Sequence, residues 1–350
     1  MIWDAIMSGF ISVSDYLSAH VLACLVPAFF IAGAVAVFVS KQSVIRYFSS
    51  NTKKIVSYSI ASISGTLLAV CSCTILPLFA GIYKRGAGIG PATTFLYSGP
   101  AINILAIIYT ARVLGFDLGA ARAVLAITMS ILIGLIMAFL FKNPDINNKT
   151  STQFEIGEER IRPQWVELLL FVFLVLILIV GTTKLGLAIR VSTIIFLLLG
   201  VIVLLKYHFS GDEVRNWGNE TWDLTKKIFP ILIAGTFFVG VIAYYLPPET
   251  FRAFLGGNSL ASCFTASIIG ALLYMPTLLE IPIVATTFGY STGVIGGGPA
   301  LSLLLSGPAV SLPSMLALQR ILGTTRTVSY ILLVVFFSTL GGFAYGNLVG

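Results

Sequence analysis

"GPATTFLYSGPAIN" (Gly90–Asn103) and "GPALSLLLSGPAVS" (Gly298–Ser311) are two versions of one motif, placed 208 residues apart in the chain. Each begins with Gly-Pro-Ala, carries Ser-Gly-Pro-Ala near its end and is otherwise mostly apolar. A proline inside an apolar helix removes a backbone hydrogen bond, and lipid does not tolerate the freed carbonyl unless protein or a water-filled cavity satisfies it. The pair therefore predicts a duplicated, helical membrane protein whose helices break at matching places.

The composition also favours a membrane protein. Of the 350 residues, 57% are hydrophobic and only 10% are charged, which excludes an ordinary soluble domain. Apolar runs long enough to cross a hydrocarbon core of about 30 Å, which takes about 20 helical residues, recur along the chain. We predict an all-α polytopic membrane protein with about ten transmembrane helices. The expected spans are 18–39, 55–83, 89–114, 119–141, 164–183, 188–205, 224–246, 259–290, 297–318 and 327–348.

The duplication extends beyond the opening motif. "GTLLAVCSCTILPL" (Gly65–Leu78) aligns with "GALLYMPTLLEIPI" (Gly270–Ile283) at a shift of 205 residues, and "FIAG" (Phe30–Gly33) aligns with "LIAG" (Leu232–Gly235) at a shift of 202. We therefore expect two homologous four-span halves with broken helices, joined by polar loops and two linking spans. The predicted divisions are a first membrane repeat at 1–141, a linking region at 142–223 and a second membrane repeat at 224–350.

The spans also predict a topology. The second and eighth, 55–83 and 259–290, are too long for simple helices and each contains a proline, so each is expected to be broken, tilted or re-entrant. An even number of spans separates corresponding elements, which predicts halves of the same orientation. The short odd-numbered loops carry basic residues and almost no acids, which favours both termini on the outside.

Hydrophobic segments interrupted by Gly and Pro at corresponding places in two halves indicate the substrate site of a transporter. Pro77 and Pro282 correspond and are predicted helix breaks, as are the two Ser-Gly-Pro stretches. We expect these breaks to face one central cavity; plain kinks that shape helix packing are the alternative, and for Asn103 and Ser311 the alternative is helix-helix hydrogen bonding. The substrate-binding residues expected at the breaks are Ser98, Gly99, Pro100, Asn103, Ser306, Gly307, Pro308 and Ser311.

Two cysteines, Cys71 and Cys73, precede Pro77 in an apolar segment. On a regular helix residues i and i+2 point about 200° apart, so both sulfurs reach one atom only if the backbone unwinds ahead of Pro77. Two thiolates there would form a soft site for thiophilic species such as trivalent arsenic or Cu(I), and not for Mg or Ca. The alternative is that they are small buried hydrophobes, the role we assign to Cys24 and Cys263.

Glu280 is the clearest ionisable residue at membrane depth. It lies two residues before Pro282, and the corresponding position in the first half is Ile75. Such a group is a functional candidate by default, and we expect Glu280 to serve in proton coupling. The structural alternative is an ion pair with an arginine such as Arg320.

Several function classes are excluded by what the sequence lacks. Its 21 Lys and Arg residues give a net charge of +7 but lie mostly in short loops without basic clusters, so no nucleic acid partner is expected. No nucleotide-binding motif, cofactor motif or metal-ligand cluster is found, and we predict neither an enzyme nor a resident cofactor or metal. The expected partners are the lipid bilayer, a small-molecule substrate and protons, in a multi-pass protein of the cell (plasma) membrane.

The motifs resemble those of a known family. "CSCTILPLFAGIYKRGAGIGPATTFLYSGPAIN" (Cys71–Asn103) is similar to the signature of the ArsP organoarsenical efflux permeases, and the Glu280–Ala309 block resembles that family's matching segment. The resemblance covers essentially the whole chain and implies export of trivalent organoarsenicals such as methylarsenite. The residues that carry over from the family's motifs are Cys71, Cys73, Pro77 and Ser98–Ala101, and among them Cys71 and Cys73 are expected to bind substrate.

Three alternatives stay open on the sequence. A permease could carry another metal-thiol or sulfur compound, and an intramembrane thiol redox protein or a structural membrane subunit would have the same composition. Inorganic arsenite prefers three thiolates, whereas a monomethyl arsenical can be held by two. One Cys-Ser-Cys pair therefore favours the organic compound, unless Cys24 or Cys263 supplies a third sulfur.

Overall fold

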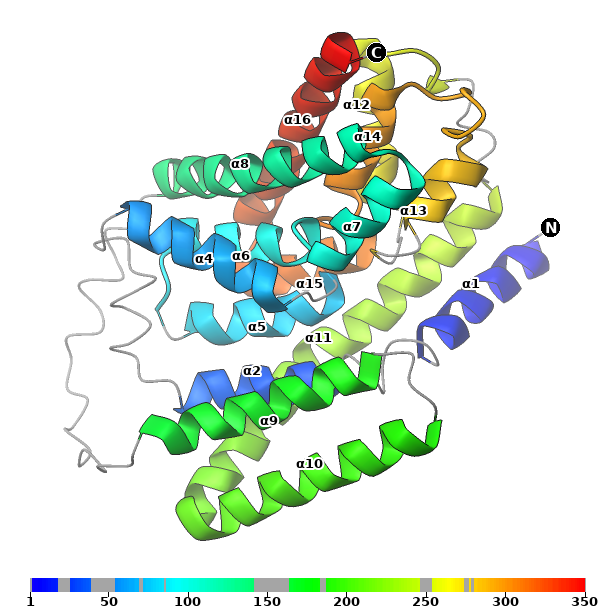
Figure 1. Ribbon diagram of the computed structural model, residues 1–350. Helices are drawn as coiled ribbons and strands as arrows, with labels where there is room; N and C mark the ends of the chain where they lie inside the picture. Colours follow the sequence, from blue (N-terminus) through cyan, green and yellow to red (C-terminus); the bar gives the residue numbers. More distant parts are fainter. Residues whose placement is uncertain are drawn as a thin grey trace.

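The computed structural model describes residues 2–17, 26–38, 54–68, 72–84, 86–141, 164–182, 187–245, 254–273, 277 and 280–349. The regular secondary structure of these residues is helical, which confirms the predicted all-α class (Figure 1). The first elements are α1 (Ile2–Tyr16), α2 (Val26–Phe38), α4 (Lys54–Leu68), α5 (Ser72–Lys84), α6 (Ile89–Ala101), α7 (Ile104–Val113) and α8 (Phe116–Leu140). They are followed by α9 (Gln164–Thr182), α10 (Leu187–His208), α11 (Gly211–Tyr245), α12 (Leu260–Leu272), α13 (Glu280–Pro282), the π-helix η3 (Ile283–Thr287), α14 (Gly297–Ser306), α15 (Leu312–Leu322) and α16 (Thr324–Val349).

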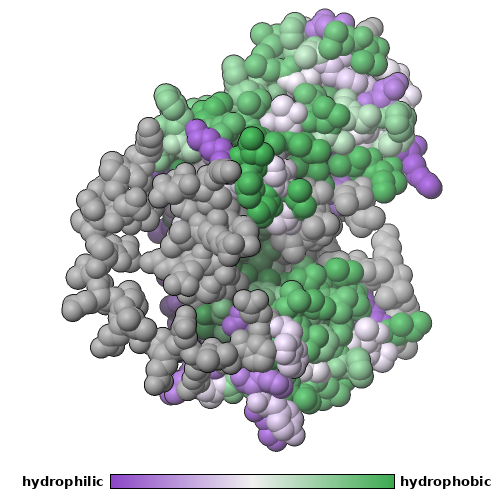
Figure 2. Space-filling model, turned by 60° about the vertical axis from the view of Figure 1, so that its left-hand side comes forward, coloured by the Kyte–Doolittle hydropathy of each residue, from purple (hydrophilic) through white to green (hydrophobic). Residues whose placement is uncertain are grey.

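Three of the described helices, α8, α10 and α16, are long and apolar enough to cross a membrane alone. A fourth span results if α6 and the Ala106–Val113 part of α7, which are bent by 43° relative to each other, are counted as one broken span. The described surface is extensively apolar (Figure 2), as lipid contact requires. The total of about ten spans stays a prediction, because several expected spans run through residues outside the described ranges.

The chain leaves helical structure just after both Ser-Gly-Pro stretches. α6 runs through Pro100, ends at Ala101, and is followed by α7 from Ile104. α14 ends at Ser306, and a non-helical turn leads to α15, which has a proline in its first turn. Two short helices therefore replace one long helix at each motif.

The other two predicted breaks differ from each other. α5 continues through Pro77, which corrects the expectation of a break at that residue. α4 ends at Leu68, and Cys71 lies outside the described residues, so the predicted unwinding ahead of the proline stays untested over 69–71. Pro282 does lie at a boundary, between α13 and the π-helical turn η3. π-Helical turns are rare and occur often at functional sites.

The two sets of helices share spacing and packing. α6, α7 and α8 begin at residues 89, 104 and 116, while α14, α15 and α16 begin at 297, 312 and 324, which is 208 residues later in each case. α4 packs on α6 and α6 on α8, just as α12 packs on α14 and α14 on α16. The upper part of Figure 1 shows both groups together.

One interhelical hydrogen bond is also repeated at the same shift. The Thr94 hydroxyl donates to the Ser130 carbonyl oxygen at 3.1 Å, and the Ser302 hydroxyl donates to that of Ser338 at 3.1 Å. Both donors are in the helix that begins with the Gly-Pro-Ala motif, α6 or α14. Both acceptors are in the long helix that follows, α8 or α16.

The remaining helices flank this core. α1 packs along α11, and α11 also contacts α2 and α15. α9 and α10 pack against each other at the bottom of Figure 1. An exposed ion pair of 2.7 Å between Lys84 Nζ and Glu220 Oε2 joins α5 to α11. The Trp217 indole donates to the Phe30 carbonyl oxygen at 2.9 Å and fixes α11 against α2.

Candidate functional site

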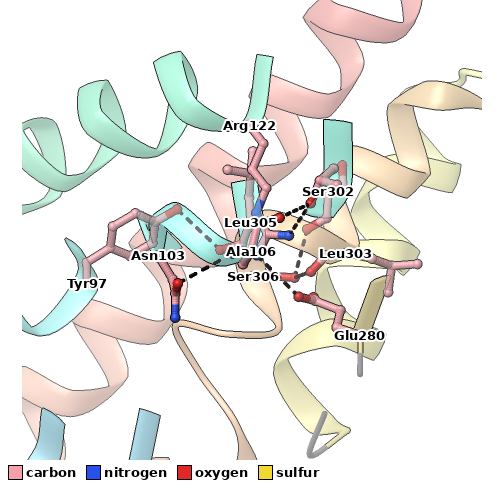
Figure 3. Close-up of polar contacts among 10 residues, drawn as sticks. Tyr97, Asn103, Ala106, Arg122, Glu280, Ser302, Leu303, Leu305 and Ser306 are labelled. Carbon is pink, nitrogen blue, oxygen red and sulfur yellow. Dashed lines mark hydrogen bonds and ion pairs between the residues drawn. The ribbon is translucent and has the colours of Figure 1, made fainter. Parts of the chain in front are cut away.

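A pair of opposite charges lies buried where the broken helices meet. Arg122 is in α8 and Glu280 is the first residue of α13, and both side chains are 0% exposed. Arg122 Nη2 is 3.5 Å from Glu280 Oε2, so the two are joined by a single long contact (Figure 3). Charge-assisted N–H···O bonds are commonly about 2.7–2.9 Å, and this pair is therefore loosely formed.

The guanidinium is held from the other side by α7. Arg122 Nη1 donates to the Thr110 hydroxyl oxygen at 2.9 Å, and that hydroxyl donates to the Ala106 carbonyl oxygen at 2.7 Å. Because the threonine proton is used one turn back in its own helix, its oxygen is free to accept from arginine. Arg122 Nε has no hydrogen-bond partner among the described residues.

Glu280 is packed against the second Ser-Gly-Pro stretch. A Cβ added at Gly307 would lie 2.5 Å from Glu280 Oε1, so a larger residue here would require the carboxylate to move. Oε1 has no hydrogen-bond partner in the described part of the chain. Glu280 and the turn after α14 are therefore direct neighbours in the structure.

Tyr97 links the two Ser-Gly-Pro helices next to the charge pair. Its hydroxyl donates to the Leu305 carbonyl oxygen at 3.2 Å and lies 3.7 Å from the Met129 sulfur. Leu305 follows Tyr97 by 208 residues, so the bond joins equivalent positions of α6 and α14. Tyr97 is also within electrostatic range of Arg122 and Glu280.

The predicted polar residues of the breaks are buried and bonded to protein. The Ser98 hydroxyl is shared between the carbonyl oxygens of Phe95, at 3.2 Å, and Ala61, at 3.3 Å. The Ser306 hydroxyl donates to the Ser302 carbonyl oxygen at 2.9 Å. These bonds orient both hydroxyls toward helix backbone. The other predicted residues of the two breaks, Gly99, Pro100, Gly307 and Pro308, are buried as well.

Asn103 and Ser311 occupy equivalent places before α7 and α15. Asn103 Oδ1 accepts from the Ala106 amide at 3.4 Å, and the Ser311 hydroxyl is 2.8 Å from that of Ser314. Each side chain thus contacts the first turn of the helix that follows. Asn and Ser are common helix-capping residues, so the helix start accounts for both contacts without a ligand.

The cysteines are only partly described. Cys71 and Cys24 lie outside the described residues, and for Cys73 only the helical backbone at the start of α5 is described. Cys263 is buried in α12, with its sulfur 3.0 Å from the place of a Cβ added at Gly298. This position fits the packing role expected for Cys263. Among the described residues no three His, Cys, Asp or Glu side chains are grouped to hold a metal ion.

An apolar pocket lies beside the turn after α14, with room for about one water molecule. The Tyr330 hydroxyl at this pocket has no hydrogen-bond partner among the described residues. That all four predicted breaks face one cavity stays a prediction, because residues 69–71 and the first side chains of α5 lie outside the described part of the structure. The pocket is lined by Ile75, Leu76, Leu96, Ala309, Val310, Ser314, Met315, Leu318, Tyr330 and Ile331.

This pocket and the charge pair occupy equivalent positions in the two sets of helices. Ile75 corresponds to Glu280 at the shift of 205, and Tyr330 corresponds to Arg122 at the shift of 208. The position of Thr110 is likewise taken by Leu318. Each place therefore combines residues from both sets, charged and hydrogen-bonded at the Arg122–Glu280 pair and mostly apolar at the pocket.

Arg122 was missed by the sequence reasoning. The suggested partner of Glu280, Arg320, is instead an exposed residue of α15 and makes no ion pair in the described structure. A signal for Arg122 existed, because it is a lone arginine in the apolar run "LGAARAVLAITMS" (Leu118–Ser130). A charge within a membrane-spanning helix calls for a partner of opposite sign.

A helical membrane protein with broken helices and an intramembrane charge pair is the class defined by this fold and site. Residues 6–347 match the family ArsP_1, which is described as a predicted permease. The chain belongs to this family of permeases, and the resemblance seen in the two motifs is confirmed.

Relatives with curated sequences agree with this assignment. The chain is 44% identical over 348 residues to UPF0718 protein MJ0584 of Methanocaldococcus jannaschii, an alignment that covers 96% of this chain and 94% of that protein. It is 24% identical over 261 residues to UPF0718 protein YraQ of Escherichia coli, which covers 73% of this chain and 59% of that protein. No solved structure gives a significant match.

Proposed function

We propose that this permease is a secondary transporter of the plasma membrane that exports trivalent organoarsenicals, methylarsenite-like compounds above all. The observation that carries a transport role is the buried Arg122–Glu280 pair at the junction of broken helices in a member of a predicted-permease family. An intramembrane pair of this kind is expensive to bury and typical of ion and substrate pathways. The sequence contains no Walker A motif, so an ion gradient, most simply of protons, supplies the energy.

Cys71 and Cys73 support the choice of substrate. Trivalent arsenic binds thiolates, and a methylated arsenical has two positions left for sulfur once carbon occupies the third. In the sequence the two cysteines precede Ile75 and Leu76, which line the apolar pocket. A soft donor pair in an apolar segment fits a small organometalloid better than a hard ion.

The two sets of helices are proposed to be copies of one ancestral unit. Their equal spacing, equal packing partners and repeated Thr94–Ser130 and Ser302–Ser338 hydrogen bonds support this proposal. In transporters built from repeats, the substrate site lies at the interface between the repeats. The bond from Tyr97 to Leu305 joins α6 to α14, and it supports a proposed site between these two helices.

The test is transport by variants of the thiol pair. Cys71→Ser and Cys73→Ser should each abolish methylarsenite accumulation in everted vesicles, because each removes one soft donor, while the amount of folded protein in the membrane stays normal. Full activity of the double serine variant would rule out the thiol site. Cys263→Ser is the matched control and should transport normally, since that sulfur has a packing role.

A second candidate function, transport of another metal-thiol or sulfur compound, would be supported by the same charge pair. Resistance of a sensitive host to methylarsenite, phenylarsenite and inorganic arsenite separates the two candidates. Growth protection against the organic compounds favours organoarsenical export, whereas absence of protection against all three favours another substrate. A thiol redox enzyme is least supported, because Cys71-Ser-Cys73 has no neighbouring histidine in the sequence.

A further inference from the structure

The charge pair connects two segments that are distant in sequence. Arg122 and its partner Thr110 belong to α8 and α7, whereas Glu280 begins α13 and lies against Gly307 in the turn after α14. α13 also packs on α7 directly. Figure 3 shows the arginine between these two segments, with its guanidinium directed toward the carboxylate.

The pair is sensitive to any change in its charge. Its single contact measures 3.5 Å, and Arg122 Nε and Glu280 Oε1 both lack hydrogen-bond partners among the described residues. A buried ion pair is held together only while both of its opposite charges are present. A protonated carboxyl group is neutral and leaves the charge of the guanidinium uncompensated. Gain of one proton by Glu280 therefore removes the attraction that joins the two segments.

We propose that Arg122 is a positioning residue and forms a proton-controlled latch with Glu280, closed while the carboxylate is ionised and open once it takes a proton. When the latch is closed, α13 and the Gly307 turn are held against α7 and α8. When it opens, the second Ser-Gly-Pro turn separates from α7. The role of the latch in export rests on the proposed function, but its opening is a property of the protein itself.

Among the titratable groups around the latch, Glu280 is the one that can gain a proton. The titratable groups in electrostatic range of Glu280 in the described structure are Arg122, from α8, and Tyr97, from α6. Tyr97 donates its hydroxyl proton to the Leu305 carbonyl oxygen, and Thr110 and Gly307 carry no ionisable group. At the equivalent place, the positions of Glu280 and Arg122 are taken by Ile75 and Tyr330, which offer no carboxylate. The latch is therefore present at one of the two equivalent places and not at the other.

Hydrogen exchange of the wild-type protein in lipid nanodiscs tests the latch without any substrate. After correction for the intrinsic pH dependence of exchange, protection of peptides from α7 and from the Gly307 turn should fall about tenfold or more between about pH 8 and about pH 4, a range that extends to the ordinary titration of a glutamate side chain. Peptides from α10, which is remote from the pair, should change little. Equal protection at both pH values would overturn the proposal.

The double variant Arg122→Met/Glu280→Gln provides the second measurement. It removes both charges and so avoids a lone buried charge, and its protection should be low and independent of pH. Arg122→Lys keeps the charge and should keep the pH response. A pH response in the double variant that equals the wild-type response would show that another group titrates, and the latch would be rejected.

The matched control is the exposed pair of α5 and α11. Lys84 Nζ and Glu220 Oε2 are 2.7 Å apart and their side chains are 40% and 38% exposed, so solvent already screens them. Lys84→Met/Glu220→Gln should leave the exchange of α7 and the Gly307 turn as pH-dependent as in the wild type. Loss of the response in this control would mean that neutralising any ion pair alters these peptides, and would remove the support for Arg122.

A transport assay in parallel separates the latch from the proposed function. Methylarsenite uptake driven by a pH gradient is measured in everted vesicles with the wild type and the double variant. A pH-dependent exchange without any arsenical transport would leave the latch standing and reject the proposed substrate. Gradient-driven transport by a wild type with flat exchange would reject the latch and leave the substrate standing. Transport by the double variant at the wild-type rate would reject the role of the latch in export and also leave the substrate standing.

Discussion

At the scale of single residues, Glu280 illustrates how one buried charge determines its neighbours. The carboxylate is fully buried, and its first requirement is an opposite charge, which Arg122 supplies from α8. Its second requirement is space, which Gly307 supplies by having no side chain. The serines of the breaks satisfy their hydroxyls on backbone carbonyls nearby, so they need no such partner.

Removal of the arginine side chain should be costly. Arg122→Ala leaves Glu280 buried without its counter-charge and should destabilise the protein by about 3–5 kcal/mol. Arg320→Ala, at an exposed position of α15, should change stability by no more than about 0.5 kcal/mol. Thermal unfolding of both variants in detergent at neutral pH compares them. Equal stability of the two variants would contradict the ion pair with Arg122.

At the scale of elements, the turn after α14 shows why this short helix must end. The Gly307 amide still donates a helical hydrogen bond to the Leu303 carbonyl oxygen at 2.9 Å. Pro308, the next residue, has no amide hydrogen and cannot continue the series of helical hydrogen bonds. The helix ends against Glu280, so the same residues that break α14 also form a wall of the candidate site. Sequence and site geometry are coupled at this turn.

A single added methyl group tests this coupling. Gly307→Ala would place its Cβ 2.5 Å from Glu280 Oε1, and the resulting overlap should destabilise the protein by about 1–3 kcal/mol. Gly218→Ala is the control, because its Cβ meets no atom within 4 Å. The Gly218→Ala substitution lies in the interior of α11 and should leave the stability of the protein unchanged or raise it by about 1 kcal/mol or less. Midpoints of thermal unfolding that fall in the opposite order would disprove the contact with Glu280.

At the scale of the whole molecule, the described helices form two similar groups around the Tyr97–Leu305 contact. α4, α6 and α8 repeat the packing of α12, α14 and α16, while α9, α10 and α11 lie to one side in Figure 1. Equivalent positions of the two groups differ in chemistry, since Arg122 and Glu280 form an ion pair whereas Tyr330 and Ile75 line an apolar pocket. Two similarly packed groups of helices thus carry different side chains at equivalent positions.

The two halves are predicted to have the same orientation in the membrane, and this can be tested by labelling. If they are parallel, with both termini outside, cysteines introduced at Lys53 and Arg326 of an otherwise cysteine-free chain should both react with impermeant reagents from the cytoplasmic side only. Labelling in intact cells and in everted vesicles makes the comparison. Reaction of the two positions from opposite sides would show inverted halves and one span more or fewer than expected.

The sequence alone determined the class of protein and the helix ends at the two Ser-Gly-Pro stretches and at Pro282. The apolar composition, the Ser-Gly-Pro stretches and the intramembrane position of Glu280 are local features, and each has a local physical consequence that periodicity and proline chemistry make predictable. The family followed from the same motifs. The break assigned to Pro77 failed because α5 accommodates its proline within the helix, which depends on neighbouring helices rather than on the proline.

Only the tertiary structure decided the partner of Glu280. Arg122 lies 158 residues earlier in the chain, and no periodicity within one helix relates the two. Their meeting depends on how α8, α7 and α13 pack together, and Arg320, although nearer in sequence, is placed by α15 on an exposed face. Burial explains why Glu280 and Arg122 pair, because a charge buried inside a membrane protein is costly unless an opposite charge lies next to it, at whatever distance along the chain.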